Sequence, residues 1–166
     1  VAPKEETVML TAEDLGGELQ VLVAEDNEIN RRVIIGMLKR IGCQVTFAVD
    51  GREAVQLVTQ RQFAIVLMDC QMPEMDGYEA TIAIRNHSGP NQHTPIVALT
   101  ASAMQNKKDK AYQIGMNDYM TKPFVFIELI ARVRSLIRRS GYNTTEIIKI
   151  DTLEVDLAKR SVKRAT

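Results

Sequence analysis

The sequence has 166 residues, of which 45% are hydrophobic, and its 21 acidic side chains balance 21 basic ones. This length suffices for one well-buried domain with extra segments, and the neutral charge argues against a protein that coats a polyanion. Cys43 and Cys70 are too few and too dispersed for a disulfide framework or a metal site, so we expect a reducing compartment. No apolar run approaches the roughly 20 residues that span a bilayer, and the N-terminus lacks the basic-then-apolar pattern of a signal peptide, so we expect a cytoplasmic protein without membrane contact.

Five short runs predict the strands of a parallel sheet. They lie at residues 21–24, 44–48, 64–68, 96–99 and 118–120, and the second run is weaker than the others. The first, third and fourth are rich in Val, Ile and Leu and are bounded by polar or turn residues. This composition is typical of central parallel strands that are buried on both faces.

Helical patterns separate the predicted strands. The first helix is predicted from an apolar stripe and would end at Gly42 as a C-terminal cap; the stripe contains Val33, Ile34, Met37, Leu38 and Ile41. Further helices are predicted after Gly51, at residues 77–86 and at residues 104–114. The last predicted helix would direct five apolar side chains into the core: Leu129, Ile130, Val133, Leu136 and Ile137. The alternation predicts an α/β, doubly wound (βα)5 domain.

Two segments lie outside this domain, which we place at residues 19–140. Residues 1–18 lack a sustained periodicity and are interpreted as an N-terminal linker. Residues 141–166 alternate polar and apolar side chains in short bursts, which predicts a linker followed by a β-rich tail of two or three strands. That tail is too small to bury a core of its own.

Charged and polar side chains follow the predicted strands at their carboxyl ends. Glu25 and Asp26 follow the first strand, Asp69 the third, Thr100 the fourth and Lys122 the fifth. Because parallel strands end at one edge of a sheet, we expect all five side chains to converge there. Three carboxylates and one ammonium sum to −3 + 1 = −2, a charge that is costly unless a cation shares the site. Donor oxygens without His or Cys favour Mg²⁺ over zinc or copper.

Each of these residues also has a structural interpretation. Glu25 and Asp26 could be carboxylates that cap the following helix, and Asp69 taken alone could simply begin a loop. Asp76 and Gly77 are interpreted as a turn and a helix start.

Four motifs in order, "VLVAEDNEINRRV", "VLMDCQMPEMDG", "VALTA" and "TKPF", resemble the receiver domain of two-component response regulators over residues 19–139. The resemblance implies a flavodoxin-like fold and a phosphoacceptor role for Asp69. It implies that Mg²⁺ is held by Glu25, Asp26, Asp69 and the backbone carbonyl of Gln71. Thr100 and Lys122 would contact the phosphoryl oxygens, and the resemblance favours a cis bond before Pro123.

The implied function is a phosphorylation-controlled switch in a two-component phosphorelay. A sensor histidine kinase or a histidine phosphotransfer protein would donate the phosphoryl group from a phosphohistidine. The chain would be no enzyme beyond its own phosphorylation and autodephosphorylation. Tyr119 would be a rotating aromatic that changes the surface of the fourth helix, fifth strand and fifth helix, with a static, half-buried side chain as the alternative.

A homodimer enhanced by phosphorylation is expected from the similarity of the last helix, "ELIARVRSLIRR", to winged-helix response regulators. In that arrangement Lys108 would meet Glu128 of the other subunit, and Asp118 would meet Arg132 and Arg139. Asn117 departs from the second acid that is commoner in the family, which would weaken the dimer. The alternative is that these charges are solvated and the domain is monomeric.

Two other functions are less compatible with the sequence. Phosphatases of the haloacid dehalogenase type need a second acid two residues after the nucleophile, where this chain has Gln71. The tail "IDTLEVDLAKRSVKR" resembles the small N-terminal sheet of winged-helix effector domains, but no recognition helix follows, so we expect no DNA binding by this chain. Because "EDNEINRRV" resembles receivers of hybrid kinases whereas "ELIARVRSLIRR" resembles the last helix of winged-helix regulators, we also hypothesise a chimera joined near residues 122–124.

Overall fold

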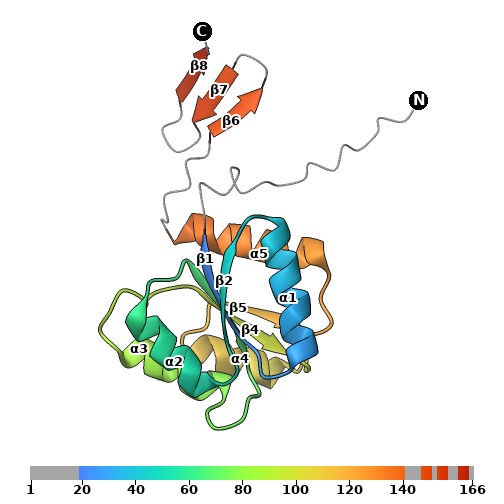
Figure 1. Cartoon of the computed structure of the whole chain (residues 1–166), viewed down its shortest axis with the longest axis vertical. Helices are drawn as coiled ribbons and strands as arrows, with labels where there is room; N and C mark the ends of the chain where they lie inside the picture. The colour runs from blue at the N-terminus through green and yellow to red at the C-terminus, as the bar shows by residue number, and fades with distance from the viewer. Residues whose placement is uncertain (1–18, 141–146, 151–152, 157–160, 165–166) are drawn as a thin grey trace, which may run out of the picture.

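Five parallel strands alternate with five helices in the computed structural model of the chain (Figure 1). The structure describes residues 19–140 and the strands at 147–150, 153–156 and 161–164. The strands are β1 (Gln20–Ala24), β2 (Gln44–Ala48), β3 (Ile65–Asp69), β4 (Ile96–Thr100) and β5 (Asp118–Thr121). The helices are α1 (Glu28–Arg40), α2 (Gly51–Gln60), α3 (Gly77–Asn86), α4 (Gln105–Gln113) and α5 (Phe126–Arg139). The predicted (βα)5 fold is therefore confirmed.

The strand order β2-β1-β3-β4-β5 reverses the direction of winding after β2. The chain steps from β1 outward to β2, returns across β1 to β3, and then continues to β4 and β5. In open α/β sheets the crevice at such a reversal, outside the carboxyl ends of the strands, is where ligands bind. Here it lies between the ends of β1 and β3.

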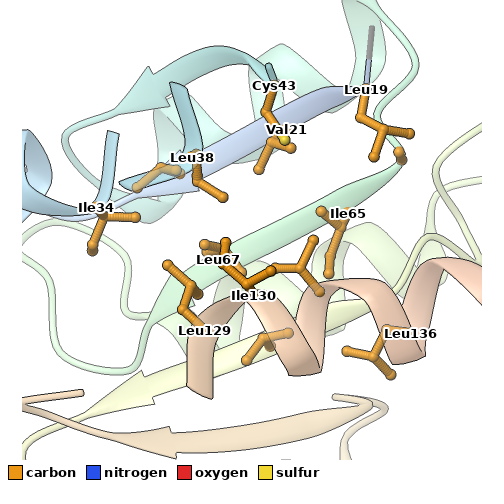
Figure 2. Packing of buried hydrophobic residues seen from close by; sticks show 14 of the residues in the cluster. Leu19, Val21, Ile34, Leu38, Cys43, Ile65, Leu67, Leu129, Ile130 and Leu136 are labelled. Carbon is orange, nitrogen blue, oxygen red and sulfur yellow. The ribbon is translucent and has the colours of Figure 1, made fainter. Parts of the chain in front are cut away.

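Helices cover both faces of the sheet, and each face has its own apolar core. Side chains of α1 and α5 pack on one face, and those of α2, α3 and α4 pack on the other (Figure 1). Every residue of β3 is buried, as a strand covered on both sides requires. Figure 2 shows α1 and α5 packing against β3 through Ile34, Leu38, Leu129, Ile130, Ile65 and Leu67.

The predicted inward faces are mostly confirmed. All five apolar residues predicted for the last helix are buried in α5. In α1 the prediction was wrong for Val33, which is 50% exposed, because the contact with the sheet is made by Ile34, Leu38 and Ile41. Gly42 follows the end of α1 with φ at 80°, the left-handed conformation expected of a residue that terminates a helix.

The tail contains β6 (Ile147–Ile150), β7 (Leu153–Asp156) and β8 (Ser161–Arg164), which pair antiparallel as one sheet. The β-rich tail is therefore confirmed as three short strands, while the predicted linkers at 1–18 and 141–146 lie outside the described residues. Among the helices between residues 28 and 139, none combines the length and the apolar composition that a membrane crossing requires.

Candidate functional site

The carboxyl ends of the central strands gather three acidic residues. Asp69 is the last residue of β3, and Glu25 and Asp26 directly follow β1. One carboxylate oxygen from each of the three lies within 4.8 Å of the others. Glu25 is 1% exposed and Asp69 is 6% exposed, whereas Asp26 is on the surface. The three acids therefore lie together at one edge of the sheet, as predicted.

Lys122 joins the two buried carboxylates. Its Nζ lies 2.5 Å from Oε2 of Glu25 and 2.8 Å from Oδ2 of Asp69. Burial lowers the pKa of Lys122, but the hydrogen bonds and charges of Asp69 and Glu25 outweigh burial, so its pKa is raised above the ordinary value. The ammonium is therefore charged at neutral pH and offsets part of the negative charge.

Backbone amides bind the remaining oxygens of these carboxylates. The amide of Asn27 donates to Oε1 of Glu25 at 3.2 Å, and the amide of Gln71 donates to Oδ1 of Asp69 at 3.1 Å. The cap of α1 is the side chain of Asn27, which accepts from the amide of Asn30 at 3.0 Å. The capping interpretation of Glu25 and Asp26 was therefore wrong, and the pattern that identifies the cap is Asn27 before the helix.

The donor set suits a hard divalent cation. It consists of carboxylate oxygens only, and one of the acids, Asp26, is exposed to solvent. With Lys122 included, the local charge is −3 + 1 = −2, which one divalent ion would neutralise. Mg²⁺ prefers oxygen ligands and retains several waters, so a site that is open at Asp26 fits it.

Thr100, Ser102 and Tyr119 form a chain of hydrogen bonds beyond β4. The carbonyl of Thr100 accepts from the amide of Lys122 at 2.7 Å, and its hydroxyl oxygen accepts from the amide of Ser102 at 3.2 Å. The Tyr119 hydroxyl donates to the carbonyl of Ser102. Tyr119 is 5% exposed, so its ring points inward. The peptide bond between Lys122 and Pro123 is cis, as the resemblance favoured.

A cleft of about 580 Å³ extends from this site along α4. Its lining comprises Asp26, Cys70, Gln71, Met72, Pro73, Asp76, Tyr78, Thr100, Lys107 and Lys110. Tyr78, Lys107 and Lys110 were not predicted, because Tyr78 follows a turn and the two lysines occur in a polar helix that gave no signal of where they face. The ammonium of Lys110 lies 4.2 Å from the centre of the Tyr78 ring, a distance that permits a cation–π interaction.

Several residues predicted for a dimer interface contact each other within one chain. Arg132 contacts Asp118 at 2.6 Å and Glu128 at 3.3 Å, and the Lys108 ammonium lies 5.6 Å from the centre of the Tyr119 ring. Arg139 is the last residue of α5 and is exposed. The contacts that these residues would make across a dimer axis remain a prediction.

Asn117 has a role inside the chain that its position in the sequence did not reveal. Its side-chain oxygen accepts from the amide of Ile96 at 2.9 Å and from the guanidinium of Arg85 at 2.9 Å. Arg85 also donates to the carbonyls of Gly115, Gln92 and Thr94. Asn117 therefore helps to join α3 to the loop before β5.

Comparison with known proteins agrees with the geometry of the site. A family model described as the response regulator receiver domain matches residues 21–134. Hybrid signal transduction histidine kinase G of Dictyostelium discoideum is 40% identical over 131 residues, which are 78% of this chain and 4% of that protein. The chain thus spans a small part of this relative.

Two solved structures share both the fold and a substantial part of the sequence. The receiver domain of the sensor histidine kinase PA1611 from Pseudomonas aeruginosa, with a magnesium ion coordinated in its active site cleft, is 39% identical, with a TM-score of 0.69 over 74% of this chain and 99% of that one. The receiver domain of Ssk1 from Saccharomyces cerevisiae, solved with the histidine phosphotransfer protein Ypd1, is 31% identical, with a TM-score of 0.68 over 75% of this chain and 92% of that one. The chain belongs to the family of response regulator receiver domains, the signalling modules of two-component phosphorelays.

Proposed function

We propose that Asp69 accepts a phosphoryl group and that Lys122, Thr100 and a bound Mg²⁺ assist the transfer. The observation that carries the proposal is the ammonium of Lys122 between two buried carboxylates, beside the exposed acid Asp26. A carboxylate can act as a nucleophile toward phosphorus, and the residue that follows Asp69, Cys70, lines the cleft together with Asp26 and Thr100.

In the proposed reaction a carboxylate oxygen of Asp69 attacks the phosphorus atom of a phosphohistidine. The new P–O bond forms as the P–N bond breaks, and the imidazole nitrogen keeps the electron pair of the broken bond. The amide of Gln71, 3.1 Å from Oδ1 of Asp69, holds the carboxylate in one orientation. Lys122 and the Thr100 hydroxyl supply donors for the phosphoryl oxygens, which limits the charge that builds up during transfer.

Glu25, Asp26, Asp69 and the backbone carbonyl of Gln71 are the residues that would hold Mg²⁺. The ion would neutralise phosphoryl oxygens and align the attacking group. Glu25 is held by Lys122 and by the amide of Asn27. We therefore expect Glu25 to act on the ion through water, and Asp26 and Asp69 to bind it directly.

The donor is proposed to be a sensor histidine kinase or a histidine phosphotransfer protein. The receiver domain of Ssk1 was solved with such a protein, Ypd1. In this chain α1 begins beside the site, and it exposes Ile29 by 74% and Val33 by 50% one turn later. Two apolar side chains on one face of a helix next to Asp69 suit contact with a helix of the donor.

Incubation with acetyl phosphate, with and without Mg²⁺, followed by intact-mass measurement, tests the proposal. We expect a gain of one phosphoryl group that requires Mg²⁺ and is absent in Asp69→Asn. Full labelling of that variant would place the acceptor elsewhere. A generic phosphate ester should not be turned over, since the proposed chemistry is limited to phosphorylation and autodephosphorylation of the chain itself.

Phosphorylation is further proposed to favour a homodimer through α4, β5 and α5. Arg132 already pairs with Asp118 in one chain, so the dimer would have to exchange this contact for its equivalent across a two-fold axis. Each pair contributes only about 0.2 to 1 kcal/mol, but symmetry doubles every contact. We expect the association to weaken with salt.

Sedimentation of the beryllofluoride-treated protein tests the dimer. We expect a dimer that is lost in Arg132→Glu and partly recovered when Asp118→Arg is added. A monomer at every accessible concentration would defeat the pairing and leave the phosphoacceptor proposal untouched.

A further inference from the structure

The loop between β3 and α3, residues 70–76, forms one wall of the cleft and contains Gln71. Its base is closed by the amide of Gly77, which donates to the carbonyl of Cys70 at 3.2 Å. Within the loop, the amide of Met75 donates to the carbonyl of Pro73 at 2.7 Å. Both the base of the loop and its turn at residues 73–75 are therefore closed by a hydrogen bond, and we expect a displacement of Met75 to move Gln71 as well.

The start of α2 contacts this loop at Met75. The amide of Gly51, the first residue of α2, donates to the carbonyl of Met75 at 3.0 Å. Amides in the first turn of a helix have no partner within the helix, so this bond satisfies one of them. Gly51 is buried, and its neighbour across the contact is backbone, which cannot rotate away as a side chain would.

Gly51 fits because it has no side chain. A Cβ atom at this position would lie 2.4 Å from the carbonyl oxygen of Met75 and 3.0 Å from that of Asp76. The residues with left-handed backbone among the described glycines are Gly42 and Gly115, so Gly51 is needed for space rather than for its conformation. Any larger residue must move either α2 or the loop.

The start of α2 is fixed by side-chain hydrogen bonds and by the strand before it. The Asp50 side chain caps the helix by accepting from the amide of Glu53 at 2.8 Å, and the Glu53 carboxylate accepts from the amide of Val49 at 2.8 Å. The preceding strand is joined to the site itself, since the carbonyl of Ala48 accepts from the amide of Glu25 at 3.1 Å. The Asp76 end of the loop is held as well, by the amide of Asp76, which donates to the Glu79 carboxylate at 3.0 Å. We therefore expect a clash at residue 51 to be relieved by movement of Met75 and the loop residues before it.

We propose that Gly51 is a positioning residue of the phosphoryl-transfer site. Its close contact with Met75 sets the position of the 70–76 loop, and through it the carbonyl of Gln71 and the amide that orients Asp69. This inference rests on the proposed function, because it concerns how well the site binds Mg²⁺ and accepts phosphate. Gly51 lies outside every motif that pointed to the site, and it touches neither the ion nor the phosphoryl group.

Gly51→Ala and a matched control, Gly36→Ala, test the inference. Gly36 is also a helical glycine, but a Cβ atom there would have nothing within 4 Å. For Gly51→Ala we expect the dissociation constant for Mg²⁺, measured by calorimetry, to rise by about tenfold, the effect typical of removing support from a metal ligand. The rate of phosphorylation by acetyl phosphate should fall in proportion at low Mg²⁺ and recover largely at saturating Mg²⁺. Gly36→Ala should leave both quantities unchanged.

Hydrogen exchange separates positioning from a general loss of stability. In Gly51→Ala the amides of residues 70–77 should exchange faster while those of α5 keep their protection. Lower unfolding free energy with unchanged Mg²⁺ affinity would overturn the inference. If Gly51→Ala does not fold, Asp50→Ala, which removes the cap and loosens the same anchor, should raise the Mg²⁺ dissociation constant, and an unchanged constant would overturn the inference.

The same measurements distinguish this inference from the proposed function. A wild-type chain that took up neither Mg²⁺ nor phosphate would defeat both. Normal wild-type chemistry together with wild-type Mg²⁺ affinity in Gly51→Ala would defeat the role of Gly51 alone.

Discussion

Replacing Lys122 with methionine should destabilise the domain strongly without metal and much less with it. Methionine keeps an unbranched apolar stem but removes the ammonium that contacts Glu25 at 2.5 Å and Asp69 at 2.8 Å. The site charge then changes from −2 to −3. Both carboxylates stay buried, so the variant must either hold unpaired charge or take up protons.

The size of the effect follows from burial. Removing one partner of a fully buried ion pair costs about 3 to 5 kcal/mol. The side chain of Lys122 is 19% exposed, so solvent screening reduces our expectation to about 2 to 3 kcal/mol. The more negative site should bind Mg²⁺ more tightly, and each tenfold gain in affinity returns about 1.4 kcal/mol at saturating metal.

Urea unfolding in EDTA measures the loss of stability without metal, and urea unfolding in excess Mg²⁺ measures how much of that loss the metal restores. A matched control is Arg32→Gln, which removes an exposed pair with Glu28 whose side chains are 78% and 62% exposed. It should cost about 0.3 to 0.5 kcal/mol in either buffer. Equal destabilisation of Lys122→Met with and without Mg²⁺ would refute the reasoning. Because the folded-state pKa of Lys122 is raised above 10.5, its contribution is complete below that pH and is lost as the pH rises through the higher value.

Three further outcomes are expected from substitutions elsewhere in the chain. Burial raises the pKa of Cys43 from 9.0 to about 11, so its thiol ionises first in the unfolded state. This difference should lower wild-type stability by about 1.4 kcal/mol between neutral pH and pH 10, and urea unfolding of Cys43→Ala should lack this part of the decline. Asp26→Ala should bind Mg²⁺ more weakly by calorimetry, because it loses a ligand and part of the local field. Thr100→Ala should still gain the mass of one phosphoryl group, but phosphorylation should change α4 less than in the wild type. Hydrogen exchange in α4 tests this coupling, and a response to beryllofluoride equal to that of the wild type would contradict it.

The arrangement of the strands and of the acids was predictable because both depend on short-range patterns. Continuous apolar runs such as residues 64–68 are typical of strands buried on both faces, and a polar residue directly after such a run lies at the sheet edge. Glu25, Asp26 and Asp69 could therefore be placed together from the sequence alone. The hypothesis of a chimera joined near residues 122–124 concerns origin, which the fold does not test.

The features that escaped prediction depend on contacts between distant segments. Val33 follows the helical period of its neighbours, yet it is exposed, because it lies at the edge of the apolar stripe and the contact with the sheet is made by Ile34, Leu38 and Ile41. The contact of Gly51 with Met75 joins residues 24 positions apart in sequence. No local pattern in the sequence indicates how closely two distant segments approach each other, so a position such as Gly51 can be identified only in the folded backbone.

The hydrogen bonds beyond β4 connect Thr100 to Tyr119, the two residues expected to form the switch. A hydroxyl has one donor and two acceptor sites, so Thr100 can donate to a phosphoryl oxygen while it accepts from the amide of Ser102. A pull on Thr100 would then move Ser102, and the carbonyl of Ser102 is the acceptor for the Tyr119 hydroxyl. In this arrangement the signal would pass through the backbone of Ser102 to Tyr119. The Lys108 ammonium near the Tyr119 ring joins that response to α4, the surface proposed for the dimer.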